Sequence, residues 1–300
     1  MREASETMTT NSTYQDLEPK RLPRRGFTLG KTMIYLILSL FALSTILAFL
    51  WIIMISLKTT TEFLTTSPWA LPEVPQFKNY TIAWERARIG TYFGNSIVVS
   101  LTGASISVLV SAMAAYVLAR VPFRLNGFFR GYFLVGYMVP LFLTFIPLFF
   151  MMNSIGLSSG LTPLLLLYIA SGVPFNTFIL RGFFEALPSE LEDAAAIDGS
   201  SPFHTFWAIM LPLSWPGLVA AFLINFMSLW NEFFLALLFL NKENATMPLG
   251  LFYMAQRAEY TAQWTDLFAG MIISIVPILI VFALLQDQIT SGMTEGAIKG

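Results

Sequence analysis

Long apolar stretches separated by short polar segments run through nearly the whole chain. A transmembrane helix needs about 20 consecutive, mostly apolar residues to cross a bilayer. Helices satisfy their backbone hydrogen bonds internally in lipid, whereas barrel strands would alternate polar and apolar side chains over about ten residues. The pattern therefore predicts an all-α polytopic membrane protein with six transmembrane helices, at about residues 32–56, 95–119, 131–152, 161–180, 213–240 and 266–285.

The polar segments divide the chain into three regions. We expect a disordered tail over 1–31, a six-helix transmembrane domain over 32–285 and a short C-terminal tail over 286–300. The first apolar stretch is too long for the core of a signal peptide and no small-residue cleavage site follows it, so we interpret it as a span. Four prolines are expected to kink the helices that contain them, namely Pro140, Pro147, Pro174 and Pro277.

The amino-acid composition excludes several kinds of catalytic and metal-binding site. Hydrophobic residues make up 56% of the chain and charged residues 12%, about half the charge of an ordinary soluble domain. The absence of cysteine excludes disulfides, thiolate metal sites and cysteine nucleophiles. A single histidine, His204, leaves little room for histidine-based metal or triad chemistry. We expect no metal, no cofactor and no catalytic site, and the net charge of -1 gives no reason to expect nucleic acid as a partner.

Basic residues near the span ends predict the orientation, because cytoplasmic loops carry an excess of lysine and arginine. The loop 153–160 has none, and the loop 57–94 has Lys58, Lys78, Arg86 and Arg88, which weakens the signal without reversing it. The basic residues of the N-terminal tail and of the loop after span two place both termini and the segment 181–212 in the cytoplasm; they are Arg2, Lys20, Arg21, Arg24, Arg25, Lys31, Arg120, Arg124 and Arg130.

Small residues recur every four positions along the second span, at Gly103, Ser107, Ser111 and Ala115. Such a stripe lets two helix backbones approach closely. The partner helix belongs either to this chain or to a second protein, and packing within the chain is the more common case.

A polar hairpin is predicted between the fourth and fifth spans. Ser189 followed by Glu192 fits a capping box that starts a helix, and Gly199 fits the left-handed residue that ends it. Ser201 and Pro202 then begin a second short helix that runs toward Pro212. The segment is the most densely acidic part of the chain, with Glu185, Glu190, Glu192, Asp193 and Asp198. A protruding elbow with small side chains is suited to enter a socket on another protein. The alternative is a solvated loop that only joins the two spans, but such loops are usually short and lack paired caps.

The spacing within this hairpin resembles the EAA loop of ABC importer permeases, which reads E-A-A, three residues, G, nine residues, I-x-L-P. Asp193 stands where that motif has glutamate, and Glu192 precedes it, so the charge is kept with a slightly shorter reach. The other matching positions are Ala194, Ala195, Gly199, Ile209, Leu211 and Pro212. Further runs look like the sugar-importer branch of that family, close to its six-span, maltose-type subunit: 77–80, 95–96, 114–120, 230–233 and 292–300.

The resemblance covers about residues 32–300 and implies that this chain is one subunit of a larger transporter. This chain would pair with a homologous permease subunit, and the translocation path would lie between the two. An extracytoplasmic solute-binding protein would deliver a sugar, and two ATP-binding subunits would bind the cytoplasmic loops, in the inner membrane of a prokaryote. The helix within 189–199 would be the coupling helix that transmits closure of the ATPases to the spans. A phosphate-binding loop G-x-x-x-x-G-K-[ST] is then not expected in this chain, and the sequence has none.

Polar residues in the fifth span are the candidates for the substrate path: Asn225, Ser228, Trp230, Asn231 and Glu232. In one continuous helix, residues 225, 228 and 232 would share a face. A carboxyl inside an apolar span should face protein or water, so Glu232 either lines the path or makes a structural contact between spans. An ion-coupled secondary transporter that uses Glu232 is the alternative function. It is disfavoured because the spans show no evident inverted repeat and because such a carrier has no need of the acidic hairpin.

Overall fold

The computed structural model describes residues 29–297. The N-terminal tail expected over 1–31 lies almost wholly outside these residues, as do residues 298–300. The chain divides into two compact units, one ending at Phe49 and the other starting at Leu50. In the first unit, α1 (Leu29–Ser56) begins, and its side chains from residue 30 to residue 49 are all exposed. A helix whose apolar side chains are exposed on all sides is what we expect of a span that faces lipid.

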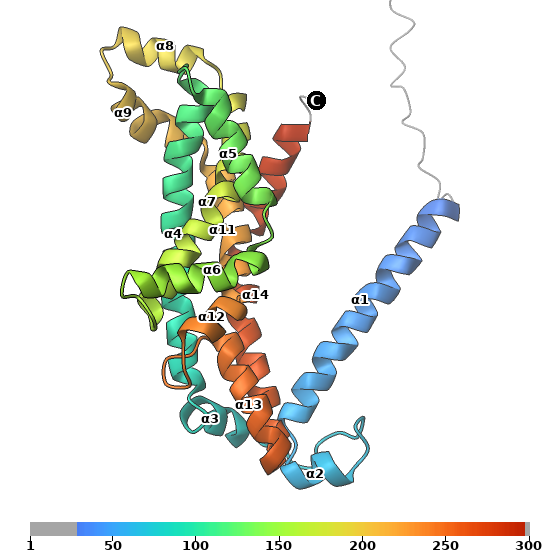
Figure 1. Ribbon diagram of the computed structural model, residues 1–300. Coiled ribbons are helices and arrows are strands. Elements are labelled where there is room, and N and C mark those ends of the chain that lie inside the picture. Colours follow the sequence, from blue (N-terminus) through green and yellow to red (C-terminus); the bar gives the residue numbers. More distant parts are fainter. Residues whose placement is uncertain (1–28, 298–300) are drawn as a thin grey trace, which may run out of the picture. The chain divides into compact units, whose positions relative to one another are not determined.

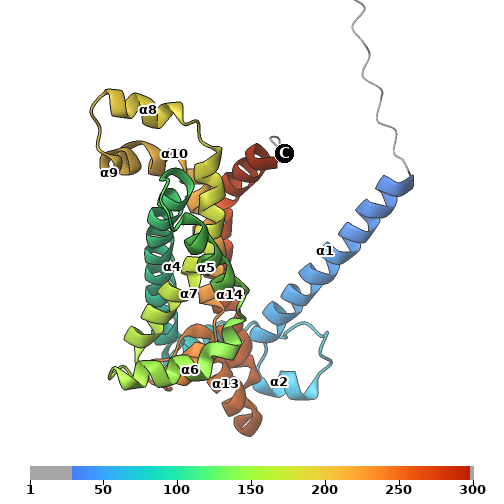
Figure 2. The ribbon, with the colours of Figure 1, turned by 45° about the horizontal axis from the view of Figure 1, so that its top comes forward.

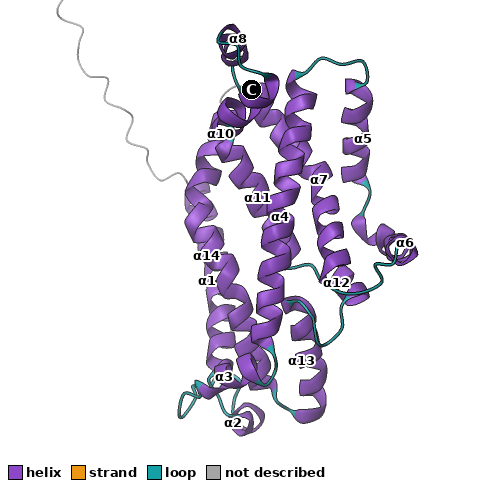
Figure 3. Ribbon diagram, turned by 90° about the vertical axis from the view of Figure 1, so that its left-hand side faces the viewer, coloured by secondary structure: helices purple, strands orange, loops and turns teal. Residues whose placement is uncertain are grey.

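Four helices form the frame of the second unit, as Figure 1 shows: α4 (Ile89–Arg120), α7 (Leu161–Ala186), α11 (Trp215–Trp230) and α14 (Trp264–Ala297). The most extensive helix pair is α4 with α7, and α11 packs against α4, α7 and α14. In the part of the chain that the structure describes, helices are joined by loops and turns and no strand is present (Figure 3). The all-α prediction is confirmed.

The small-residue stripe of α4 is used for packing inside the chain. All four of its residues are buried. A Cβ added at Gly103 would lie 3.3 Å from Cβ of Tyr168 in α7 and 3.1 Å from the Leu229 side chain in α11. The Ser111 hydroxyl donates to the backbone oxygen of Val173 in α7 at 3.3 Å. The stripe therefore serves helix contacts within the subunit.

By length and composition, four described helices can cross a membrane, and up to six spans result if each of two sharply bent helix pairs counts as one. The first bent pair is α5 (Asn126–Met138) with α6 (Leu141–Ser154), which meet at 100°. Pro140 immediately precedes α6, so the kink expected there is confirmed, although it breaks the predicted span 131–152 into two helices. Figure 2 shows α6 running across the direction of α4 and α7.

The predicted span 213–240 is also divided. The helix α11 ends at Trp230, and a second, short helix α12 (Phe234–Phe239) starts after three intervening residues. Before α11, the helical segment 202–213 meets it at 74°. At the C-terminal end, by contrast, the helix is longer than predicted, because α14 continues to Ala297 through most of the expected tail.

The two ends of the second unit differ in the elements that they carry (Figure 1). At one end lie the polar hairpin, the α4–α5 loop and the last turns of α14. At the other end lie three helices that connect or follow the long ones: α2 (Thr60–Thr65), α3 (Lys78–Glu85) and α13 (Met247–Thr261). The hairpin and the basic residues Arg120, Arg124 and Arg130 therefore share one end, as the orientation argument expects.

Candidate functional site

The polar hairpin consists of α8 (Glu190–Ile197), α9 (Pro202–Thr205), one π-helical turn (Phe206–Met210) and α10 (Leu211–Leu213). The turn between α8 and α9 depends on Gly199, whose φ is +78°, a conformation that side chains other than glycine's disfavour. The Ser201 hydroxyl accepts the backbone N–H of His204 at 3.2 Å, and Pro202 is the first residue of α9. Both turn predictions are confirmed.

The capping box predicted at the start of α8 is wrong. Ser189 has helical backbone angles, and its side chain makes no capping hydrogen bond. The Glu192 carboxylate points to α4 instead: it accepts the Tyr116 hydroxyl at 2.8 Å and lies 3.4 Å from Nε of Arg120. An ion pair with an arginine outcompetes a hydrogen bond from a neutral backbone N–H because charge-assisted contacts are about twice as strong.

Two residues at the end of α4 thus anchor the hairpin to the helix bundle. Besides its pairing with Glu192, the Arg120 guanidinium donates to the backbone oxygen of Leu187. The Tyr116 ring packs against Phe184 and Phe206 at centroid distances of 5.7 and 5.2 Å. A sequence signal for this anchor exists, because Tyr116 and Arg120 lie four residues apart on one helix face next to a polar loop. The acid that they bind was not predictable from spacing alone.

The remaining motif positions separate into an outer and an inner set. On the outer side, Asp193, Ala194 and Gly199 are exposed, together with two large apolar side chains, Ile197 at 86% and Phe203 at 69%. We call Asp193, Ala194, Ile197, Gly199 and Phe203 the hairpin tip. On the inner side, Ala195 is buried, and Ile209 and Leu211 pack against the hydrophobic cluster around Phe184 and Met210. The hairpin therefore offers a partly apolar surface outward while its base is fixed inside the subunit.

An unusual turn lies at the hairpin base, immediately before Leu211 and Pro212. Proline has no N–H, so it cannot continue the regular i→i−4 ladder. The N–H of Leu211 bonds to the backbone oxygen of Phe206, five residues back, which is the π-helical pattern. Single π-helical turns of this kind occur frequently at functional sites. Here the turn connects the hairpin to α11.

The five path candidates do not form one surface. Asn225 and Trp230 are buried, Ser228 and Asn231 are exposed, and Glu232 is half-buried. The Trp230 indole N–H donates to the backbone oxygen of Ser274 in α14 at 3.2 Å, and its ring lies against Phe93 and Phe226. The expected shared face of residues 225, 228 and 232 is lost because α11 ends at Trp230, before Glu232.

Glu232 caps the short helix α12. Its two carboxylate oxygens accept the backbone N–H groups of Leu235 at 2.7 Å and Ala236 at 3.1 Å, and the buried Tyr168 hydroxyl donates to it at 2.8 Å. The first N–H groups of a helix have no partner within the helix, and they carry a partial positive charge that stabilises an anion. Glu232 was expected either to line the substrate path or to make a structural contact between spans. These contacts favour the structural role.

Replacing Glu232 by alanine should therefore destabilise the subunit. The change removes a helix cap worth about 1 kcal/mol and leaves the buried Tyr168 hydroxyl unpaired, at a further cost of about 1 to 3 kcal/mol. Glu232→Gln retains one acceptor oxygen and should cost less, and Asn231→Ala at the exposed neighbour should be nearly neutral. Thermal unfolding of the purified chain in detergent measures all three. Loss of uptake in Glu232→Gln at unchanged thermal stability would contradict the structural role.

A buried polar junction lies where α4, α7 and α11 meet, and sequence reasoning identified only its Ser107 and Asn225. The Asn176 amide nitrogen donates to the Ser107 hydroxyl at 3.2 Å. Gly172 permits the close approach, because a Cβ there would lie 2.5 Å from both the Ser107 hydroxyl and the Asn225 amide nitrogen. Asn225 thus belongs to the contact between helices, and the sequence signal that was missed is the G-x-x-x-N spacing of α7.

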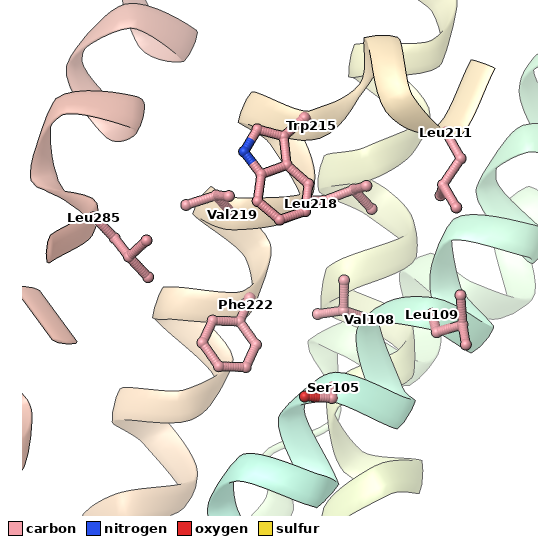
Figure 4. A pocket seen from close by; sticks show the side chains of 9 residues that line it. All are labelled: Ser105, Val108, Leu109, Leu211, Trp215, Leu218, Val219, Phe222 and Leu285. Carbon is pink, nitrogen blue, oxygen red and sulfur yellow. The ribbon is translucent and has the colours of Figure 1, made fainter. Parts of the chain in front are cut away.

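An apolar groove of about 480 Å³ opens between α4, α11 and α14 near the hairpin base. Figure 4 shows its lining, in which Ser105 contributes the one hydroxyl among otherwise apolar side chains. Sugar sites need several hydrogen-bonding groups to replace the water that sugar hydroxyls lose. This groove is suited to lipid chains or to an apolar helix and is not a candidate sugar site. Its lining residues are Ser105, Val108, Leu109, Leu211, Trp215, Leu218, Val219, Phe222 and Leu285.

Comparison with known proteins bears on the hairpin and the fold. Residues 107–295 match the family model described as "Binding-protein-dependent transport system inner membrane component". The diacetylchitobiose uptake system permease protein NgcG of Streptomyces coelicolor is 36% identical over 264 residues, covering 88% of this chain and 87% of that protein. The sulfoquinovosyl glycerol transport system permease protein SmoH of Agrobacterium fabrum is 32% identical over 278 residues, covering 92% and 96%.

Among solved structures, a chain of a bacterial ABC transporter involved in the import of the acidic polysaccharide alginate has the same fold. The TM-score is 0.73 at 22% sequence identity, over 87% of this chain and 98% of that one. At this identity the likeness concerns the fold alone.

Proposed function

This chain belongs to the family of binding-protein-dependent transport system inner membrane components, and we propose that it is the permease subunit of an ATP-driven importer of an oligosaccharide or disaccharide. The chain provides half of the translocation path and has no catalytic role. Its hairpin couples closure of the ATP-binding subunits to alternating access of the path. The names of the relatives, which are permease proteins of diacetylchitobiose and sulfoquinovosyl glycerol systems, support a carbohydrate substrate.

The observation that carries the coupling role is the contrast between the two sides of the hairpin. The tip exposes Ile197 and Phe203, large apolar side chains that gain free energy when a partner covers them. The base is tied to α4 by the Glu192 contacts and to α11 through the helical segment 202–213. A partner that moves the tip therefore moves two long helices of the bundle.

The proposed assembly contains a homologous permease subunit, two ATP-binding subunits and an extracytoplasmic solute-binding protein. The ATP-binding subunits bind at the hairpin end, which places that end in the cytoplasm. As a separate part of the proposal, both termini are cytoplasmic. The clustering of Arg120, Arg124 and Arg130 at the hairpin end supports this orientation. The opposite end, with α2, α3 and α13, then faces the solute-binding protein.

An ion-coupled carrier that uses Glu232 is not favoured. Such a carrier needs a carboxylate that binds and releases an ion, whereas three donors already occupy Glu232. Within the described residues, no group of three or more histidine, aspartate or glutamate side chains is placed to hold a metal ion. The geometry of Glu232 is that of a helix cap.

Reconstitution of the purified assembly in proteoliposomes tests the proposal. We expect uptake of a labelled oligosaccharide only when ATP, the ATP-binding subunits and the solute-binding protein are all present. A proton gradient alone should drive no uptake, because the chain has no free carboxylate along the broken fifth span. Sugar transport by this chain alone, driven by a proton gradient, would contradict the proposed function.

A further inference from the structure

A small pocket with four cationic side chains lies at the end of the bundle opposite the hairpin. Its cations come from three separate segments: the turn between α3 and α4, the loop after α12, and α13. The volume of the pocket is about 220 Å³, and its charged lining consists of Arg86, Arg88, Lys242 and Arg257. None of these residues belongs to the hairpin or to the path candidates.

The cations of this basic pocket lack ion-pair partners. Within the described part of the chain, none of the four forms a salt bridge. One carboxylate, Asp266 of α14, interacts electrostatically with Arg257 and Arg86, which leaves the pocket with an excess of positive charge. All four side chains are exposed, so solvent screens part of their mutual repulsion, and an anion that enters the pocket lowers what remains.

Arg88 is unusual in its backbone conformation and in its position at a helix N-terminus, and an anion would offset the electrostatic cost of the second. Arg88 has a φ of +65°, and non-glycine residues in this conformation cluster at functional sites. The residue is also the N-cap of α4, a helix of 32 residues whose N-terminus carries partial positive charge. An arginine at that position is electrostatically unfavourable unless a negative group lies nearby.

The walls of the pocket are held firmly. The buried Tyr92 donates its hydroxyl to the backbone oxygen of Lys242 at 3.0 Å, which fixes the loop that carries this lysine. The Tyr92 ring rests directly on Gly250, where an added Cβ would lie 2.1 Å from the ring. The Tyr253 side chain completes the lining on the α13 side. The backbone that carries Lys242 is therefore fixed against α4, and α4 packs closely on α13.

The size of the pocket limits what it binds. A water molecule occupies about 30 Å³ of liquid, so the cavity has room for a few solvent-sized groups. Ligand pockets for drug-sized molecules begin at about 300 Å³, so this pocket suits a smaller group. A tetrahedral oxyanion fits, and arginine side chains bind phosphate oxygens in a bidentate manner.

We propose that this basic pocket binds a phosphate-class oxyanion, supplied either by the headgroup of an anionic phospholipid or by free phosphate. The ends of transmembrane helices lie at the level of the lipid headgroups, and long basic side chains there extend toward the interface. Binding there ties α4 to α13 and so stabilises the end of the bundle opposite the hairpin. The inference does not depend on which solute the chain transports.

Phosphate binding to the full chain in nanodiscs of neutral phosphatidylcholine tests the proposal. We compare the native chain with the double variant Lys242→Gln/Arg257→Gln, which changes two exposed residues, and with Arg124→Gln, an exposed arginine at the hairpin end. Titration calorimetry with inorganic phosphate should show saturable binding in the native chain and in Arg124→Gln. The affinity of the double variant should fall by about tenfold to a hundredfold, since each of the two lost charge-assisted contacts is worth up to about one decade.

A second arm distinguishes the two sources. In nanodiscs that contain phosphatidylglycerol, loss of phosphate binding together with selective retention of that lipid in native mass spectrometry identifies the headgroup as the ligand. Unchanged phosphate binding identifies the free anion. The proposal is overturned if the native chain neither binds phosphate nor retains phosphatidylglycerol, or if Arg124→Gln weakens binding as much as the double variant does.

Discussion

Gly199→Val should strongly reduce coupled uptake while the subunit still folds and inserts into the membrane. Gly199 has a φ of +78°, and a left-handed backbone costs an ordinary residue roughly 1 to 2 kcal/mol, with β-branched residues penalised most. No atom lies within 4 Å of a Cβ built at this position, so the penalty arises from the backbone conformation alone. The hairpin would relieve it by changing the α8–α9 turn, which displaces the tip from its partner.

The measurement is ATP hydrolysis and sugar uptake by the reconstituted assembly. Uptake should fall by about tenfold or more, which corresponds to about 1.4 kcal/mol of lost coupling, while ATP hydrolysis continues. The chain offers a matched control in Gly156, which has a φ of +82°, is exposed and has no neighbour within 4 Å of an added Cβ. Gly156 lies in the loop between α6 and α7, outside the hairpin. Normal uptake in Gly199→Val, or an equal loss in Gly156→Val, would remove the coupling role from this turn.

Glu192→Ala should loosen the hairpin base, whereas Asp193→Ala should leave it intact. Glu192 pairs with Tyr116 and Arg120, while Asp193 is exposed on the tip. Charge-assisted hydrogen bonds contribute about 1.5 to 3 kcal/mol when buried, and partial exposure of this pair reduces that value. We expect a loss of about 1 to 2 kcal/mol for Glu192→Ala, against less than about 0.5 kcal/mol for Asp193→Ala, as for other surface changes.

Thermal unfolding of the purified chain and uptake by the assembly separate the roles of these two acids. Glu192→Ala should lower both the unfolding temperature and uptake. Asp193→Ala should lower uptake alone, because its carboxylate is free to meet the ATP-binding subunit. Arg120→Ala, which removes the other half of the anchor, should resemble Glu192→Ala. Equal unfolding temperatures for the two acid variants would mean that the Glu192 contacts do not hold the hairpin.

The hydrophobic pattern was sufficient to predict the long apolar helices but not their breaks, and it did not predict α13. An apolar stretch has the same composition whether the helix within it is continuous or bent, so the ends of α5 and α11 were not visible in residues 131–152 and 213–240. Pro140 gave the position of the first bend but not its size of 100°. The break between α11 and α12 contains no proline. It depends on Glu232 capping α12, a contact that also needs Tyr168 from a different helix.

Local turn chemistry was predicted well at Gly199 and Ser201, because backbone conformation and hydrogen bonds within four residues decide it. It failed at Ser189, where a long-range partner decided the outcome: Arg120 attracted the Glu192 carboxylate that the capping box required. The basic pocket was hidden for the same reason, since Arg88 and Arg257 lie far apart in the sequence. Spacing reveals contacts along one helix and misses those between helices.

Labelling of a single cysteine on the hairpin tip tests the central claim most directly. The chain has no native cysteine, so Ile197→Cys places one thiol at the most exposed large apolar position of the tip, where the native side chain is 86% exposed. Ile155→Cys, outside the hairpin and 63% exposed, is the control. We expect a maleimide to label both thiols in the purified chain, and the ATP-binding subunits to protect Ile197→Cys but not Ile155→Cys. Equal labelling of Ile197→Cys with and without those subunits would contradict the docking of the hairpin.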